Sequence, residues 1–319
     1  MESYRKDLMR ENDLISVLLP VYNGEDYIGE TISSILKSSY TFFEIIIVDD
    51  GSTDDTAQVV RRYIKTDNRI KYYYKRNGGI TSSLNYGLER CTGDFIARID
   101  SDDLVKSDRL ELQIKRLKAD PSLIAVGSNV EYIGSRNGFS NLPTSSEDCA
   151  CVSLFCTPVM HPSVMFRNIG QRYSSDYPHA EDYEFFSRML YQGKIENISE
   201  ALTLYRIHDK QISKLHNKEQ FRSQAKISYE NLTRLYNEKS VLFTPYRYFT
   251  LVSNFLRSSY IERSTIQDSL VKKIVYLSPH LGFRGLFILF KLMRIGRFGF
   301  FEMLKSFVRW IYWSLILLK

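Results

Sequence analysis

A chain of 319 residues with 44% hydrophobic content can bury a substantial core, which excludes a disordered protein and fits one large domain or two smaller ones. The formal net charge is +6, but residues 280–319 carry the whole excess, and bases and acids balance elsewhere. A neutral body with a basic, aromatic tail disfavours a nucleic-acid groove and favours contact with a membrane surface.

Short apolar runs alternate with helical patterns through the first hundred residues. Four runs are expected to form strands, at 15–23, within 42–56, at 69–74 and at 94–100. Apolar residues at helical spacing follow the first two runs, a glycine turn and a helix follow the third, and Thr53 or Asp54 is expected to cap the second helix. This alternation predicts an α/β fold with a mostly parallel sheet covered by helices on both sides.

The rest of the chain is less regular. A helix is expected at 109–117, a strand at 123–129 ("LIAVGSN") and a polar stretch at 134–148. Beyond residue 216 the pattern is helical to the end. The four cysteines form no paired C-x-x-C block, and residues 1–14 lack the apolar core of a secretory signal, so the sequence predicts reduced thiols in a cytoplasmic protein.

Polar residues cluster where three of the predicted strands end, at Tyr22 and Asn23, at Asp49 and Asp50, and at 100–103. Ligands of open parallel sheets bind beyond the carboxyl ends of the strands, although Asp and Asn are also common in ordinary turns. Three clusters at successive strand ends favour a shared site. Neither G-x-G-x-x-G nor G-x-x-x-x-G-K-[ST] is present, which disfavours dinucleotide and P-loop phosphate sites.

The segment "RIDSDD" predicts a cation site. Asp100 and Asp102, one residue apart on a tight turn, can offer oxygens to one small hard cation, and Mg²⁺ or Mn²⁺ favours such donors together with phosphates. Asp102, with or without Asp100, would then join the cation to a diphosphate and stabilise the charge that develops as the diphosphate leaves. An isolated D-x-D is common, and its position after a fourth strand gives it weight.

Seven motifs in chain order resemble the family 2 glycosyltransferases, which have the GT-A fold. They cover about residues 14–215 and read "PVYNGE" at 20–25, "VDDGSTDD" at 48–55, "NGGITSSLNYG" at 77–87, "ARIDSDD" at 97–103, "HPSVMFR" at 161–167, "AEDYEFFSRM" at 180–189 and "YRIHDKQIS" at 205–213. The resemblance implies a Rossmann-like GT-A domain with a nucleotide-sugar-binding half at 1–105 and an acceptor-binding half at 106–215. A helical C-terminal region at 216–319 would follow.

The resemblance also implies roles for individual residues. Asp102 is expected to bind Mn²⁺ or Mg²⁺, and Asp182 to take the proton of the acceptor hydroxyl as general base. Asp49 or Asp50 is expected to accept hydrogen bonds from the base or ribose. The donor nucleotide site as a whole is expected to comprise Pro20, Tyr22, Glu25, Asp49, Asp50, Asn77, Asp100 and Ser101.

Three further residues, Glu181, His161 and His208, have two interpretations each, and Arg206 has one. Glu181 is expected beside the acceptor, but it and Asp182 also suit a helix N-terminus. His161 is expected in the acceptor region or as a packed loop residue. His208 is expected to approach the metal or diphosphate, or to pair with Asp209, and Arg206 is expected to supply charge to the leaving diphosphate.

The implied reaction is displacement at the sugar C1 with inversion. "YRIH" stands where processive relatives carry Q-x-x-R-W, so one sugar per encounter is expected. The implied donor is a nucleotide-diphosphate hexose or N-acetylhexosamine, with UDP as nucleotide, and the acceptor a polyprenyl-diphosphate-linked glycan of O-antigen, lipopolysaccharide or capsule synthesis. The alternatives are a dTDP-rhamnose-type transferase and a non-catalytic nucleotide-sugar-binding subunit. A homo-oligomer is compatible with each of these functions.

The tail at 286–319 is apolar but interrupted by bases. Its longest uncharged run near the end, 310–318, is shorter than the roughly 20 residues of a spanning helix. Helical spacing places its bases within one arc, with Trp, Phe and Leu over the rest, which is typical of an interfacial helix or of a helix packed on the body or a partner. The first interpretation predicts a peripheral protein on the inner face of a bacterial plasma membrane.

Overall fold

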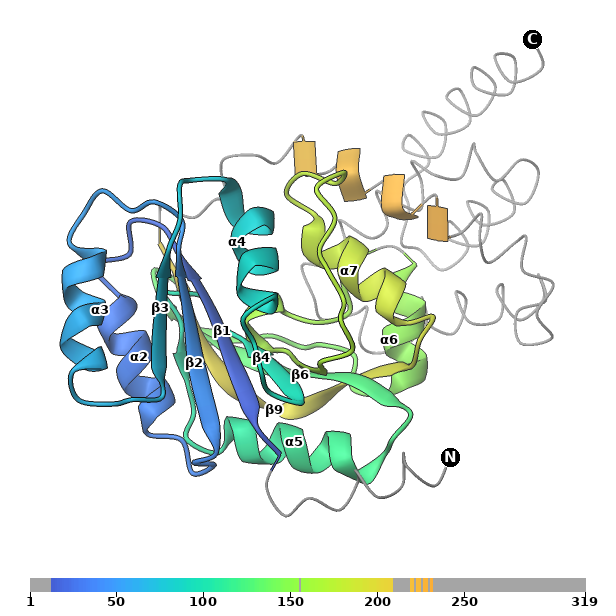
Figure 1. Ribbon diagram of the computed structural model, residues 1–319. Coiled ribbons are helices and arrows are strands. Elements are labelled where there is room, and N and C mark those ends of the chain that lie inside the picture. The colour runs from blue at the N-terminus through green and yellow to red at the C-terminus, as the bar shows by residue number, and fades with distance from the viewer. Residues whose placement is uncertain are drawn as a thin grey trace, which may run out of the picture.

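One mixed β-sheet runs through the part of the chain that the computed structural model describes, which is residues 13–154, 156–208 and, between 219 and 231, all but 221, 225 and 229 (Figure 1). Its strands follow the order β3-β2-β1-β4-β8-β6-β9-β5, and β7 pairs with β6. The strands are β1 (Ile15–Val21), β2 (Phe43–Asp49), β3 (Ile70–Tyr74), β4 (Phe95–Arg98), β5 (Leu104–Val105), β6 (Leu123–Gly134), β7 (Gly138–Phe139), β8 (Met165–Arg167) and β9 (Lys194–Ile207). The helices are α2 (Ile28–Leu36), α3 (Thr56–Ile64), α4 (Gly79–Leu88), α5 (Arg109–Ala119), α6 (Ser146–Ser153), α7 (Glu181–Met189) and the short η2 (His161–Ser163).

The four strands predicted first form the parallel part of the sheet. Every residue of β1 and β2 is buried, because helices cover both faces of these apolar strands. Val17 of β1 lies beside Ile45 of β2 on one side and Ala97 of β4 on the other. The parallel register brings the carboxyl ends of β1, β2 and β4 to the same edge, as the sequence predicts.

The second half of the sheet contains pairings that the sequence pattern does not reveal. β8 runs antiparallel between β4 and β6, and so joins the predicted donor-binding half to the rest. β6 begins where the strand at 123–129 is predicted but continues to Gly134, and it pairs in parallel with β9. The sheet is therefore continuous across the predicted boundary at residue 105.

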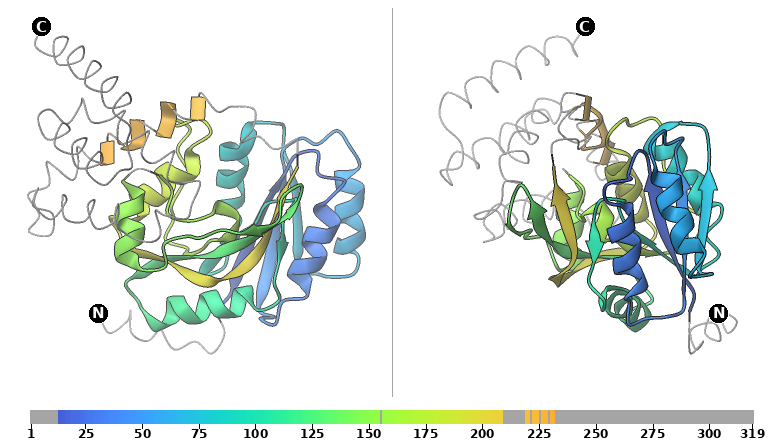
Figure 2. Two further views of the ribbon diagram at one scale, coloured as in Figure 1. Left: turned by 180° about the vertical axis from the view of Figure 1, so that it is seen from behind. Right: turned by 90° about the vertical axis from the view of Figure 1, so that its left-hand side faces the viewer.

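The sheet divides the core into two layers, and helices cover both of its faces (Figures 1 and 2). Apolar side chains of α2, α3 and α5 pack on one face, and those of α4 and α7 pack on the other. Each fully buried Leu, Ile or Phe contributes about 1.5–3 kcal/mol to folding. The packing of α4 is close enough that a Cβ added to Gly87 would lie 2.2 Å from Leu18 Cδ1, so α4 is held directly on β1.

The start of α3 corrects a detail of the sequence prediction. Asp55, and neither Thr53 nor Asp54, occupies the N-cap position. The side chain of Asp54 nevertheless accepts a hydrogen bond from the Thr56 backbone N–H at 3.1 Å. The N–H group of Thr56 is thus satisfied by Asp54, one residue before the N-cap position and one of the two residues expected to cap this helix.

The predicted tail at 286–319 lies outside the described residues, as does nearly all of 216–319. Among the residues that are described, no helix combines the length and apolar character needed to cross a membrane.

Candidate active site

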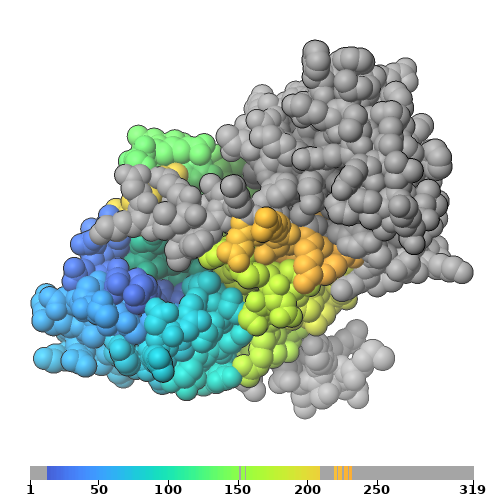
Figure 3. Space-filling model, turned by 90° about the horizontal axis from the view of Figure 1, so that it is seen from above, coloured from blue at the N-terminus to red at the C-terminus, as the bar shows by residue number. Residues whose placement is uncertain are grey.

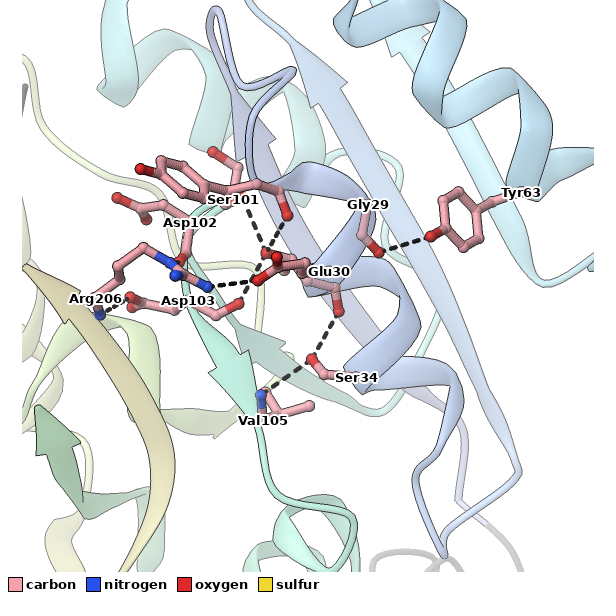
Figure 4. Close-up of polar contacts among 11 residues, drawn as sticks. Gly29, Glu30, Ser34, Tyr63, Ser101, Asp102, Asp103, Val105 and Arg206 are labelled. Carbon is pink, nitrogen blue, oxygen red and sulfur yellow. Dashed lines mark hydrogen bonds and ion pairs between the residues drawn. The ribbon is translucent and has the colours of Figure 1, made fainter. Parts of the chain in front are cut away.

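The loop at 100–103, directly after β4, is held in place by α2 and β9 (Figure 4). Thr31 of α2 donates its hydroxyl to the backbone oxygens of Ser101 at 2.9 Å and Asp103 at 2.8 Å. The backbone N–H of Arg206, near the end of β9, donates to Asp103 Oδ1 at 2.8 Å. Both neighbouring elements thereby fix the loop that carries the predicted cation ligands.

Three carboxylates meet in this loop. Oxygens of Asp100, Asp102 and Asp103 all lie within 4.8 Å of one another. Burial raises the pKa of Asp100, and burial together with the charges of Asp100 and Asp102 raises the pKa of Asp103 well above its usual value. Asp103 Oδ2 is enclosed and accepts no hydrogen bond from the described residues. Such clustered, poorly hydrated oxygens fit a small divalent cation, and Asp103 is a candidate ligand that the sequence reasoning missed.

His208 lies in this cluster. Its Nε2 is 2.8 Å from Asp102 Oδ2, and its ring stacks on Tyr27 with the ring centroids 5.5 Å apart. The two predicted metal ligands are therefore neighbours. Asp209, the alternative partner, lies outside the described residues.

Arg206 has partners other than a diphosphate. Its Nη2 is 2.7 Å from Glu30 Oε2, its Nε donates to the Asp102 backbone oxygen at 2.9 Å, and its guanidinium lies over the Tyr27 ring (Figure 4). These contacts join β9 to α2 and to the acidic loop. The expectation that Arg206 supplies charge to the leaving diphosphate stays a prediction, and in this structure the guanidinium is paired with Glu30.

The two aspartates after β2, which are predicted to contact the nucleoside, are buried. Asp49 is fully buried, and its oxygens accept from the Ser52 N–H at 2.7 Å and the Tyr72 hydroxyl at 2.6 Å. Asp50 accepts from Lys75 Nζ and from the N–H groups of Gly78 at 2.9 Å and Gly79 at 2.7 Å. Asp49 has no exposed surface for a base or ribose, and Asp50 shapes the glycine turn before α4.

The remaining donor-site residues surround this buried pair. Tyr22 is 53% exposed, and Asn77 is exposed on the turn that Asp50 organises. Glu25 Oε2 accepts the Asp55 N–H at 2.7 Å, so this carboxylate is engaged with the start of α3. Pro20 is buried in β1, and Ser101 is half-buried. Tyr22, Glu25 and Asn77 are thus the predicted donor-site residues that are exposed.

A second pair of acids opens α7. Glu181 and Asp182 lie in its first turn, and no side chain caps the helix, so both interpretations of these acids remain compatible with their position. Burial and the charge of Asp182 raise the pKa of Glu181 to about 7. Burial is the largest cause of a raised pKa at the Tyr173 hydroxyl. The charge of Arg98 opposes this rise, and the charges of Asp182, Glu181 and Asp100 add to it. Acids of α7 and of the β4 loop therefore both influence the pKa of this tyrosine.

His161 is a packed residue in this structure. It is 8% exposed, its Nε2 is 2.8 Å from the Tyr173 hydroxyl, and its ring meets Phe186 edge to face. Burial holds its pKa well below the usual value. The neutral, enclosed ring supports the packed interpretation rather than direct contact with an acceptor.

The carboxyl edge of the sheet, seen from above in Figure 3, carries this site between the blue-to-cyan residues of the first half and the yellow-green residues around α7. Two residues there escaped the sequence reasoning, Tyr173 and the buried Arg98, whose Nη2 is 2.5 Å from Asp100 Oδ1. The charge of Arg98 inside the apolar run "FIARID" was the available signal.

Residues 16–175 match the family model described as Glycosyl transferase family 2. The chain belongs to this family. An uncharacterized glycosyltransferase from Haemophilus influenzae is 36% identical over 247 residues, which cover 72% of this chain and 76% of the relative. The family 2 chain is therefore a glycosyltransferase.

Solved structures support the GT-A fold of this family 2 chain. S. aureus TarS in complex with UDP-GlcNAc superimposes with a TM-score of 0.64 at 17% identity, over 89% of this chain and 88% of TarS. A mannosyltransferase from Pyrobaculum calidifontis in complex with GDP-Man and Mn²⁺ superimposes with a TM-score of 0.56 at 15% identity, over 99% of this chain and 92% of that one. At these identities the likeness concerns the fold alone.

Proposed function

We propose that this glycosyltransferase transfers one hexose or N-acetylhexosamine, with inversion, from a UDP-linked donor to a lipid-linked glycan. The observation that carries the proposal is the acid cluster of the β4 loop, where oxygens of Asp100, Asp102 and Asp103 lie within 4.8 Å of one another. This cluster suits the metal and diphosphate of a donor, and the acids in the first turn of α7, Glu181 and Asp182, suit the hydroxyl of an acceptor.

On the donor side, Asp100, Asp102 and Asp103 would hold Mn²⁺ or Mg²⁺, with His208 beside Asp102. Such an ion would neutralise the negative charge on the leaving diphosphate. The Mn²⁺ and nucleotide sugars named for the two solved structures support a metal and a nucleotide-sugar donor here. Tyr22 and Asn77, on open surface at the same edge, would contact the nucleotide.

On the acceptor side, Asp182 would accept the proton of the attacking hydroxyl. The acceptor oxygen forms its bond to the sugar C1 as the bond from C1 to the diphosphate oxygen breaks, so the nucleoside diphosphate leaves with the bonding electrons and the configuration inverts. Burial and the neighbouring charge of Asp182 raise the pKa of Glu181 to about 7.

The Asp182→Asn variant tests this assignment. General base catalysis contributes about 10²–10⁴ in rate, so transfer is expected to fall by that factor while UDP–Mn²⁺ binding, measured by calorimetry, stays within about twofold of the unaltered protein. The matched control is Asp176→Asn, which removes a carboxylate from the loop before α7 and outside the acid clusters. Normal transfer by Asp182→Asn would show that another group is the base.

The lipid-linked acceptor is proposed from the basic, aromatic pattern of the tail at 286–319. Such an acceptor at the cytoplasmic leaflet would be used in O-antigen, lipopolysaccharide or capsule synthesis by a peripheral enzyme. Removal of residues 286–319 is expected to lower recovery of the protein with membranes while donor hydrolysis continues. Unchanged recovery with membranes would contradict the membrane contact.

A further inference from the structure

Arg98 is a charged residue in an apolar layer. It is the last residue of β4 and is 3% exposed. Because side chains two positions apart on a strand share a face, Arg98 follows Ile96 toward the layer that α4 and α7 cover. A buried guanidinium gives up its hydration, which is costly unless nearby groups replace that hydration.

The surroundings replace only part of that hydration. Nη2 contacts Asp100 Oδ1 at 2.5 Å, but Nε and Nη1 are enclosed and no described residue accepts a hydrogen bond from either. Apolar side chains in place of both Arg98 and Asp100 would fill this space without leaving donors unpaired, and such replacements of a buried ion pair are often neutral or stabilising. Packing alone therefore does not account for an arginine here.

The charge of Arg98 does suit the acids of the site. After the effect of burial, Arg98 is the leading influence that favours ionised Asp100, and it also acts in this direction on Asp103 and Glu181. The Asp100 carboxylate faces Arg98 with one oxygen and is 31% exposed. Arg98 thus holds one oxygen of Asp100, and the rest of the Asp100 side chain is accessible to solvent. This arrangement is typical of a ligand with a supporting partner.

Resting on the function proposed above, we propose that Arg98 is a positioning residue: its buried guanidinium fixes one oxygen of Asp100 and so orients this carboxylate for the metal and diphosphate of the donor. Partners of this kind, which orient a ligand without touching the metal, typically change metal affinity or activity 10- to 100-fold when they are removed. Arg98 acts through Asp100 and does not itself contact the donor.

Calorimetry with UDP and Mn²⁺ tests this role in the full chain. Arg98→Met is expected to weaken UDP–Mn²⁺ binding at least about tenfold and to lower the melting temperature, because Asp100 loses its partner. Arg98→Lys, which keeps the charge, is expected to recover part of the affinity. The control is Arg116→Met, which makes the same substitution at a more exposed arginine of α5 and removes its ion pair with Glu196 at 2.6 Å, outside the acidic loop. This control is expected to bind like the unaltered protein.

A double-variant cycle separates positioning from a general structural effect. If Arg98 acts through Asp100, Arg98→Met is expected to add less than about twofold to the loss caused by Asp100→Asn. An equal loss in both backgrounds, or normal binding by Arg98→Met, would overturn the inference and leave the proposed function intact. Absence of UDP–Mn²⁺ binding by the unaltered protein would instead overturn the proposed UDP donor, and this inference with it.

Discussion

The acids after β2 and the acids after β4 follow similar apolar strands, yet their surroundings differ. Asp49 and Asp50 are buried and their oxygens accept hydrogen bonds from nearby N–H and O–H groups and from Lys75. In the β4 loop, burial raises the pKa values of Asp100 and Asp103, and Asp103 has an oxygen with no partner among the described residues. The first pair stabilises the fold through its hydrogen bonds. In the second cluster, burial and mutual repulsion disfavour the ionised carboxylates, and a bound cation would offset this repulsion.

Asp102→Asn is expected to have the larger effect on function in this comparison. Loss of a carboxylate from the proposed metal site should weaken Mn²⁺-dependent UDP binding at least about tenfold. Chelation of the metal should reduce the unaltered protein to the same level. The melting temperature is expected to stay constant or rise, because one of three mutually repelling charges is removed.

Asp50→Asn is expected to respond in the opposite way. Each carboxylate oxygen of Asp50 accepts a backbone N–H, so the NH₂ group of the asparagine would face one of these donors. The lost hydrogen bond costs about 1–3 kcal/mol of stability. Thermal unfolding measures this loss, and calorimetry is expected to show a smaller change in UDP binding than for Asp102→Asn. If Asp50→Asn instead abolished binding and left stability unchanged, the division between scaffold and site would be wrong.

The smallest expected effect concerns Glu181 and pH. Its pKa rises from the usual 4.5 to about 7 on folding, so the folded state holds this proton more tightly than the unfolded state. The resulting stability is present below about pH 4.5 and is lost as pH rises through about 7. Melting temperatures of the unaltered protein, compared with Glu181→Gln, should therefore decline across this window. A constant difference between the two proteins would contradict the raised pKa.

The parallel half of the fold was predictable because its strands are short, fully apolar and separated by helical patterns. The first four predicted strands and the helix at 109–117 are confirmed. β9 was missed because "KIENISEALTLYRI" mixes polar and apolar residues, and its pairing with β6 joins segments far apart in the chain. Long-range pairing of this kind leaves no local signal.

Sequence reasoning found the acids of the site but not how each is used. The engagement of Asp49 depends on the hydroxyl of Tyr72, which lies on the neighbouring strand two positions before Tyr74, the register partner of Asp49. The pairing of Arg206 with Glu30 likewise joins β9 to α2 across the fold. Residue type and spacing identify candidates at strand ends, whereas tertiary partners decide which candidates keep an accessible oxygen.

The antiparallel strand β8, wedged between β4 and β6, has a consequence for exchange of parts among relatives. Because β8 pairs with a strand on each of its edges, the two halves of the chain belong to one continuous sheet. Cutting the chain after residue 105 would strip β4 of a neighbour and leave an apolar edge open to self-association. Grafts that alter sugar or acceptor preference are therefore better made in the loops above the sheet than by swapping halves.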